Sequence, residues 1–411
     1  MVNITQDFAP PFKLVAPYFI FGVLFYLISS IFSLTVNINE LNIHNPDLLS
    51  WTHLFLLGFV MMIIFGAMAQ LIPVTLEVGH FSVEFYYIIY PLLLIGTLIM
   101  ALGFSINSTF LPYGGILVLL SMFIFLVEIF LTMKKVKIFS NVIKSILVSN
   151  IFLFIGISFG IIMALTYAGQ FDANINELLK AHVFSVVLGY IIISIMALSL
   201  VLLPMFGLSH NFSQKPLNNA VIIMTISVSL VIISAIATLP IIDKLGYLSA
   251  VLSLCIYFYQ IYLIYKTRAR KENDIYIVSL FFSFACFLVS IVLGFLYIFI
   301  DYEPLLFTAS WLMFSGFIAF VIIGHLYKIV PFLVWFEKFS PLVGKQKVPM
   351  LADMVPVKDA NYQFIFASVG VVISSFGLLF MSDVIFKAGA SFIFIASVFL
   401  LKNLLFMIRF K

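Results

Sequence analysis

The sequence contains twelve long apolar runs, separated by short segments that hold most of its charged residues. A helix needs roughly 20 apolar residues to cross the hydrocarbon core of a bilayer, and each run has about that length. Apolar residues surround each run instead of forming one stripe, as expected for helices that face both lipid and protein. We therefore predict an all-α polytopic membrane protein with about twelve transmembrane helices. The expected spans are 13–35, 51–74, 85–106, 112–133, 143–167, 178–204, 217–239, 245–266, 275–300, 306–334, 362–383 and 385–408.

The composition excludes several classes of protein. Hydrophobic residues make up 64% of the chain and charged residues only 9%, whereas soluble domains are about 25% charged. The chain has no basic cluster interleaved with aromatics, so nucleic acid is not an expected partner. It also lacks phosphate-binding glycine loops, nucleophile elbows and zinc-binding His-Glu-x-x-His helices. Cys255 and Cys286 fall inside predicted spans without a Cys-x-x-Cys pattern, so we expect packing residues and no thiolate site.

The first apolar run has full spanning length and follows no basic segment. We therefore interpret it as the first helix and not as a cleaved signal.

Basic residues gather after spans four, eight and ten and at the C-terminal tail. They are Lys134, Lys135, Lys137 and Lys144, then Lys266, Arg268, Arg270 and Lys271, then Lys338, Lys345, Lys347 and Lys358, and finally Arg409 and Lys411. All lie on one side of the membrane if the spans alternate, and the positive-inside rule makes that side cytoplasmic. We expect an integral protein of a bacterial inner membrane, with the lipid bilayer as its first partner and both termini in the cytoplasm.

Spans two, six and ten share a register. In each, a glycine followed by an aromatic residue precedes a proline by 15 positions. The three sets are Gly58-Phe59 with Pro73, Gly189-Tyr190 with Pro204, and Gly316-Phe317 with Pro331. Glycine permits close helix approach, and proline near a helix exit is tolerated. We predict one membrane domain, 1–411, built from three pseudo-symmetric four-helix repeats at about 13–133, 143–266 and 275–408.

Two histidines stand at the predicted outer ends of spans two and six. His53 precedes Gly58 by 5 residues and His182 precedes Gly189 by 7, which places them on different faces unless a helix start is distorted. The third repeat has Ala309-Ser310-Trp311 in this zone. Imidazole is a common ligand of heme iron and copper. His53 and His182 are candidate ligands, with interfacial or hydrogen-bonded histidines as the alternative.

The other histidines are weaker candidates. His325 lies in the inner half of span ten, either as a ligand or as a hydrogen-bonding partner. His80 and His210 follow spans two and six, and we expect solvated cytoplasmic roles ahead of metal binding. His44 belongs to a loop.

Three further polar features lie within or beside the predicted spans. Glu128 could relay protons, but an interfacial acid paired near Lys134 and Lys135 is the favoured interpretation. Lys328, one turn from His325, can reach the inner face. Residues 335–361 form the longest predicted loop, which is aromatic enough at its start to lie along the cytoplasmic interface.

Taken together, the spans, the threefold repetition and the histidine that opens span two resemble subunit I of the heme-copper oxidase superfamily. The stretch from His53 through Gly58 and Gly66 to Pro73 is similar to that family's low-spin heme helix. The resemblance implies heme b, with His53 as an axial ligand, and it leaves copper open as a second cofactor, with His182 at the span-six copper position. Other family motifs are absent, since Ala309-Ser310-Trp311 replaces the His-x-His of span ten.

The copper-binding motifs of that family are also incomplete. Residues 217–239 contain no histidine, and Val186 stands where a tyrosine should follow His182. The resemblance therefore implies heme binding without oxidase activity.

Two stretches are similar to motifs of the NnrS family, whose heme- and copper-containing membrane proteins are linked to nitric oxide. They are the segment from His53 to Phe59, and Gly207-Leu208-Ser209-His210 with Lys215-Pro216-Leu217. This resemblance implies a role in nitric oxide or respiratory metabolism, with respiratory-chain subunits as partners. The alternatives are a cofactor-free transporter, an assembly factor or a structural subunit of a respiratory complex.

Overall fold

The computed structural model describes residues 8, 10–137 and 139–411. Within these residues, twelve helices are long and apolar enough to cross a membrane, which confirms the predicted all-α membrane fold. Residues 1–7, on which the interpretation of the N-terminus partly rests, lie outside the described residues. The spans are α1 (Phe12–Ser33), α2-η2-α3 (Pro46–His53, Leu54–Met61, Met62–Leu76), α4 (Glu84–Ser105), α5 (Leu111–Met133), α6 (Asn141–Tyr167), α7-η4-α8 (Ile175–Val183, Phe184–Ile192, Ile193–Gly207), α9 (Lys215–Ala237), α10 (Pro240–Lys266), α11 (Ile275–Ile300), α12-η5-α13 (Glu303–Trp311, Leu312–Ile318, Ala319–Lys338), α14 (Val357–Leu379) and α15 (Asp383–Ile408).

Most spans differ from the prediction by a few residues at their ends, and the eighth begins at Pro240 instead of 245. The second span begins at Pro46 because the Asn45 side chain accepts a hydrogen bond from the Leu48 N–H at 3.0 Å and caps the helix. The eleventh span begins at Val357 and ends at Leu379, shortly before Met381 adopts a φ of +50°.

The predicted loop 335–361 was too long. Its first four residues continue α13 to Lys338, and its last five begin α14, so the connection is 339–356. Within it lie the short helices η6 (Ser340–Leu342) and η7 (Leu351–Met354).

The chain divides into two compact units. Unit A contains residues 71–272, and unit B contains residues 10–70 and 273–411. In unit A, α4 pairs with α5 and α9 pairs with α10, while α6 packs against the interrupted span α7-η4-α8. The boundaries of the predicted repeats stay a prediction.

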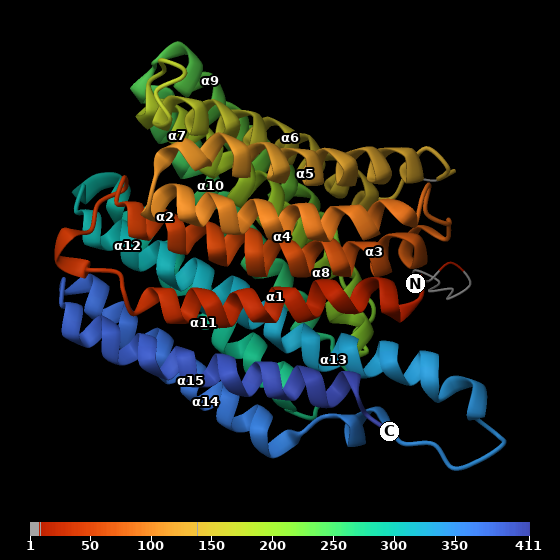
Figure 1. The fold of residues 1–411 in the computed structure, drawn as a ribbon. Coiled ribbons are helices and arrows are strands. Elements are labelled where there is room, and N and C mark those ends of the chain that lie inside the picture. Colours follow the sequence, from red (N-terminus) through yellow and green to blue (C-terminus); the bar gives the residue numbers. More distant parts are fainter. Residues whose placement is uncertain (1–7, 9, 138) are drawn as a thin grey trace. The chain divides into compact units, whose positions relative to one another are not determined.

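In unit B, α14 and α15 run side by side, and α15 also packs against α1 (Figure 1). Helix α1 contacts η2, and α11 contacts α12, η5 and α13.

Hydrogen bonds show which ends of the helices in unit B meet. The Phe12 N–H donates to Glu337 Oε2 at 2.8 Å, and Lys338 Nζ donates to the Phe410 carbonyl at 3.0 Å. The start of α1 and the ends of α13 and α15 therefore lie together. At the opposite end, the Ile38 N–H donates to Asp383 Oδ1 at 3.1 Å. This arrangement is the one that strict alternation of the spans requires.

Spans two, six and ten share a three-part construction among the described residues: a short α-helix, a π-helical segment and a longer α-helix. These spans are also the most enclosed, since 83%, 72% and 83% of an 18-residue apolar stretch in spans two, six and ten, respectively, is buried. The glycines of the shared register, Gly58, Gly189 and Gly316, each lie in the π-helical segment. An added Cβ would stand 2.3 Å from Phe25, 2.7 Å from Phe152 and 2.6 Å from Cys286, respectively. The glycines thus allow each interrupted span to contact the helix that precedes it.

Candidate functional site

His182 is held in a fixed orientation against helix α6 in unit A. Its Nδ1 lies 2.8 Å from the Gly156 carbonyl oxygen. Because a carbonyl only accepts, Nδ1 carries the proton and Nε2 presents its lone pair. The ring lies close to Gly160, where an added Cβ would stand 3.0 Å from Cε1. Within the described chain Nε2 has no hydrogen bond, so this imidazole is oriented as a metal-ligating histidine would be.

His53 ends α2 in unit B, immediately before the π-helical segment η2. Its Nδ1 lies 2.8 Å from the Leu49 carbonyl oxygen, one turn back in the same helix, and the residue is half-buried. The same argument places the proton on Nδ1. Both histidines lie just before a π-helical segment that contains the glycine of their span. Because the two spans are distorted in the same way, the offset of 5 and 7 residues between histidine and glycine is not compensated.

His325 is buried in α13, with Nδ1 2.7 Å from the Val321 carbonyl oxygen. Its Nε2 lies 3.4 Å from the Tyr276 hydroxyl, and the two rings meet edge to face at 5.0 Å. Both ring nitrogens therefore have a hydrogen-bonding partner. Of the two roles left open by the sequence, this geometry favours the hydrogen-bonding one.

Lys328 forms an ion pair with Asp274 at 2.5 Å, close to the Tyr276 ring. Asp274 also caps α11 by accepting from the Ile277 N–H at 3.2 Å. The lysine thus has a fixed partner at the start of α11.

His53 and His325 lie at different levels of unit B. Trp51 stacks on Trp311 with ring centroids 5.1 Å apart, and Phe55 lies 6.4 Å from Phe314, so spans two and ten run parallel and level at these residues. His325 is about a dozen residues further along than the level of His53, or about 18 Å at the rise of an α-helix. These two histidines cannot ligate one iron from opposite sides.

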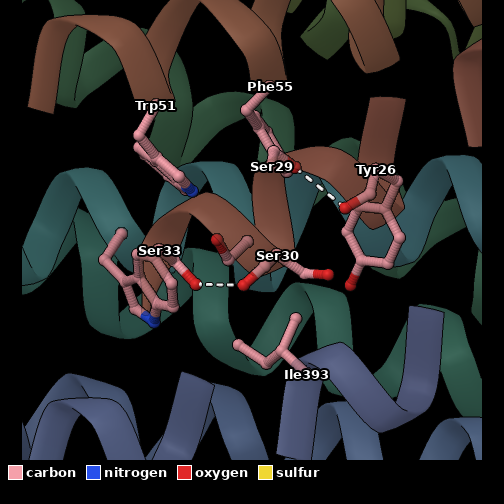
Figure 2. Close-up of a pocket in the computed structure, with 9 residues that line it drawn as sticks. Tyr26, Ser29, Ser30, Ser33, Trp51, Phe55 and Ile393 are labelled. Carbon is pink, nitrogen blue, oxygen red and sulfur yellow. Dashed lines mark hydrogen bonds between the residues drawn. The ribbon is translucent and has the colours of Figure 1, made fainter. Parts of the chain in front are cut away.

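The space between spans one, two and ten is filled by aromatic rings. Trp51 stacks on Phe55 with centroids 5.3 Å apart, and Tyr26 packs on Phe59 at 4.8 Å. A cavity of about 10 Å³ lies beside these rings (Figure 2). Small-molecule pockets usually measure about 300–1,000 Å³. This face of span two therefore offers no slot for a porphyrin, and a heme on His53 would have to occupy another face.

The expected solvated role of His80 is wrong. Its side chain is 1% exposed, and Nδ1 lies 2.9 Å from Oε1 of Glu128, whose side chain is 0% exposed. His80 is buried because the segment between α3 and α4 folds back onto α5.

The sequence suggested that Glu128 pairs with a nearby lysine, and this expectation is also wrong. Oε1 accepts from the Thr132 hydroxyl at 2.6 Å and the Phe81 N–H at 3.2 Å, and Oε2 accepts from the Tyr86 hydroxyl at 2.9 Å. Lys135 binds nearby backbone instead, with Nζ 2.8 Å from the His80 carbonyl oxygen. These donors occupy both carboxylate oxygens, which favours a structural role over proton relay.

His210 follows α8 and is exposed, in agreement with a solvated position. The backbone beside it is ordered by an isolated bridge between Ser209 and Arg268. His44 accompanies Asn42 in the loop after α1, where its N–H donates to Asn42 Oδ1 at 2.9 Å.

Among the described residues no three His, Cys, Asp or Glu side chains come together to hold a metal ion. Heme iron can be held by one or two axial imidazoles. His53 and His182 each supply one imidazole with its Nδ1 proton fixed, and they belong to different units. Cys255 and Cys286 are both free thiols.

Comparison with protein-family models and with curated proteins finds no match to this chain.

Two features of these sites could not be read from the sequence. The π-helical segments have no compositional signature, although the shared glycines mark where they lie. The His80–Glu128 pair joins residues 48 positions apart. A buried acid inside a span was the one available signal of this pair, because such an acid requires a partner.

Proposed function

We propose that this protein binds heme b in the membrane, with His53 as an iron ligand in unit B and His182 as an iron ligand in unit A. The observation that supports this most strongly is the environment of the His182 ring. The Gly156 carbonyl fixes its tautomer, and Gly160 leaves space for the ring. Metal-ligating histidines usually donate their second ring N–H to a carbonyl or carboxylate in this way. A bound heme would supply one-electron chemistry and a site for a small diatomic gas.

His325 is a less favoured ligand because the Tyr276 hydroxyl lies 3.4 Å from its Nε2. We place both termini in the cytoplasm on the basis of the basic loops, and we propose a bacterial inner membrane as the location. Its role would be in nitric oxide or respiratory metabolism, beside respiratory-chain subunits and without oxidase activity of its own.

The test is the absorption spectrum of the purified full-length protein after heme-replete expression. We expect a Soret band, together with a heme content that falls in the His53→Ala and His182→Ala variants. His210→Ala is the matched control, since His210 is exposed and should leave the spectrum unchanged. A wild-type protein without a Soret band would refute the proposal.

The second candidate is a cofactor-free membrane protein, either a transporter or an assembly or structural subunit. The aromatic packing of Trp51, Phe55 and Trp311 favours it, because these rings occupy a space between spans where a cofactor could otherwise lie. This candidate would be supported if neither the wild-type protein nor the two variants contained heme and a cytochrome co-purified with the wild type.

A further inference from the structure

A small cavity in unit B is lined by hydroxyl groups although it lies among membrane-spanning helices. Tyr26, Ser29, Ser30 and Ser33 reach it from α1, and Ser315 reaches it from the π-helical segment η5. Figure 2 shows these α1 side chains together with Trp51, Phe55 and Ile393 around the cavity. Its volume is about 10 Å³. That is close to the least space in which one water molecule fits.

Tyr26 provides an independent sign of a missing ligand. The residue is 2% exposed, and its hydroxyl has no hydrogen-bonding partner among the described residues. Buried hydroxyls are nearly always hydrogen-bonded, because leaving one unpaired loses the bonds it made to water.

The hydroxyl groups of the serines around Tyr26 donate to backbone carbonyls of α1. Ser29 donates to the Tyr26 carbonyl at 2.9 Å, Ser30 to the Leu27 carbonyl at 2.7 Å and Ser33 to the Ser30 carbonyl at 2.7 Å. Their oxygens keep lone pairs that can accept. A ligand here must therefore donate to serine oxygens and also bond the Tyr26 hydroxyl, which a water molecule does.

The lining excludes other small ligands. It contains no charged side chain, so a cation or an anion would lie among membrane helices without a counter-charge. Any neutral molecule larger than water exceeds the volume.

We infer that one water molecule is bound in this cavity, where it bonds the Tyr26 hydroxyl and bridges α1 to Ser315 of η5. Ser30 also lies 2.9 Å from the Ser397 hydroxyl, so the polar contacts extend from this site to α15. This hydration site does not depend on whether the protein binds heme.

The first test is the sign of the stability change in Tyr26→Phe, measured on the full chain in detergent. With water bound, the variant loses a satisfied hydrogen bond, and its thermal midpoint falls by an amount on the order of 2 °C. In a dry cavity the variant removes an unpaired hydroxyl, so a midpoint that rises or stays unchanged would overturn the inference.

The second test detects the water itself and does not need a stable variant. Infrared spectra of wild-type protein in H₂¹⁸O and H₂¹⁶O should show an isotope-sensitive O–H band from an internal water. Tyr26→Phe should shift or remove this band, whereas Tyr18→Phe, on the same helix but outside the cavity lining, should leave it unchanged. A high-resolution wild-type map without density beside the Tyr26 hydroxyl would also overturn the inference.

Discussion

The imidazole of His80 and the carboxylate of Glu128 form a buried pair across 2.9 Å, with side chains 1% and 0% exposed. The pair fastens the segment between α3 and α4 onto α5, and the Thr132 and Tyr86 hydroxyls complete the carboxylate's hydrogen bonds. Loss of one partner would leave the other buried without this hydrogen bond, which is costly among membrane helices.

Replacing Glu128 with alanine should destabilise the protein by about 3–5 kcal/mol, because His80 would stay buried without its acceptor. Denaturant unfolding in detergent measures this loss. His80→Ala should also destabilise the protein, but by less, because Glu128 keeps its bonds from Thr132, Phe81 and Tyr86. The double variant should cost clearly less than the two single losses together.

Glu84→Ala is the control for this pair. Glu84 is exposed and accepts from the nearby Ser82 hydroxyl at 2.7 Å, so its loss should stay within about 0.5 kcal/mol. Equal losses for Glu84→Ala and Glu128→Ala would contradict the structural role of the pair.

The glycines in the three π-helical segments should not tolerate a methyl group. In Gly58→Ala, the new Cβ would stand 2.3 Å from the Phe25 ring. We expect a loss of about 1–3 kcal/mol from overpacking, seen as a lower thermal midpoint, and a similar direction for Gly189→Ala and Gly316→Ala.

Gly294→Ala gives the opposite expectation. No atom lies within 4 Å of a Cβ added at this position of α11, so the helix should gain up to about 1 kcal/mol from the better helix former. If Gly294→Ala and Gly58→Ala changed the midpoint alike, close packing would not explain the shared glycine register.

The spans could be predicted from the sequence because hydropathy over about 20 residues reflects a one-dimensional constraint, the thickness of the bilayer. The start of the second span could not, since it depends on the Asn45 cap and not on hydropathy. The site was predicted less well. The position of His182 was expected, but the Gly156 carbonyl that orients its ring lies 26 positions away, on another helix.

His80 shows the same limit more clearly. Its place just beyond a span suggested solvent, whereas a chain reversal brings it to Glu128. Contacts of this kind depend on tertiary folding, which neither composition nor periodicity reports. The stacking of Trp51 on Trp311 is another such contact, and it decides how spans two and ten face each other.

The packing of His182 against Gly160 predicts that a substitution can weaken heme binding without unfolding the protein. In Gly160→Ala the added Cβ would stand 3.0 Å from His182 Cε1, so the ring must shift and its Nδ1 bond to Gly156 must lengthen. If the protein binds heme through His182, its heme-to-protein ratio should fall while its helical circular dichroism stays at the wild-type level. Gly115→Ala is the matched control, because its new contact would be the flexible end of Ile161 at 3.1 Å. Equal heme ratios in both variants would argue against His182 as a ligand.

The basic loops predict the orientation of the whole chain. Lys134, Lys135 and Lys137 follow α5, whereas the connection after α6 carries Asp172 and no basic residue before α7. Because translocation disfavours Lys and Arg in short loops, the connection after α5 should lie in the cytoplasm. In unit B the start of α1 lies beside the end of α15. Strict alternation of the twelve spans would place both on the cytoplasmic side. Green fluorescent protein fused after Lys411 should fluoresce, and alkaline phosphatase fused there should be inactive. The same reporters inserted after Gly169 should give the reverse result. Active phosphatase at Lys411 would mean that the protein is inserted the other way, with its basic loops outside the cytoplasm.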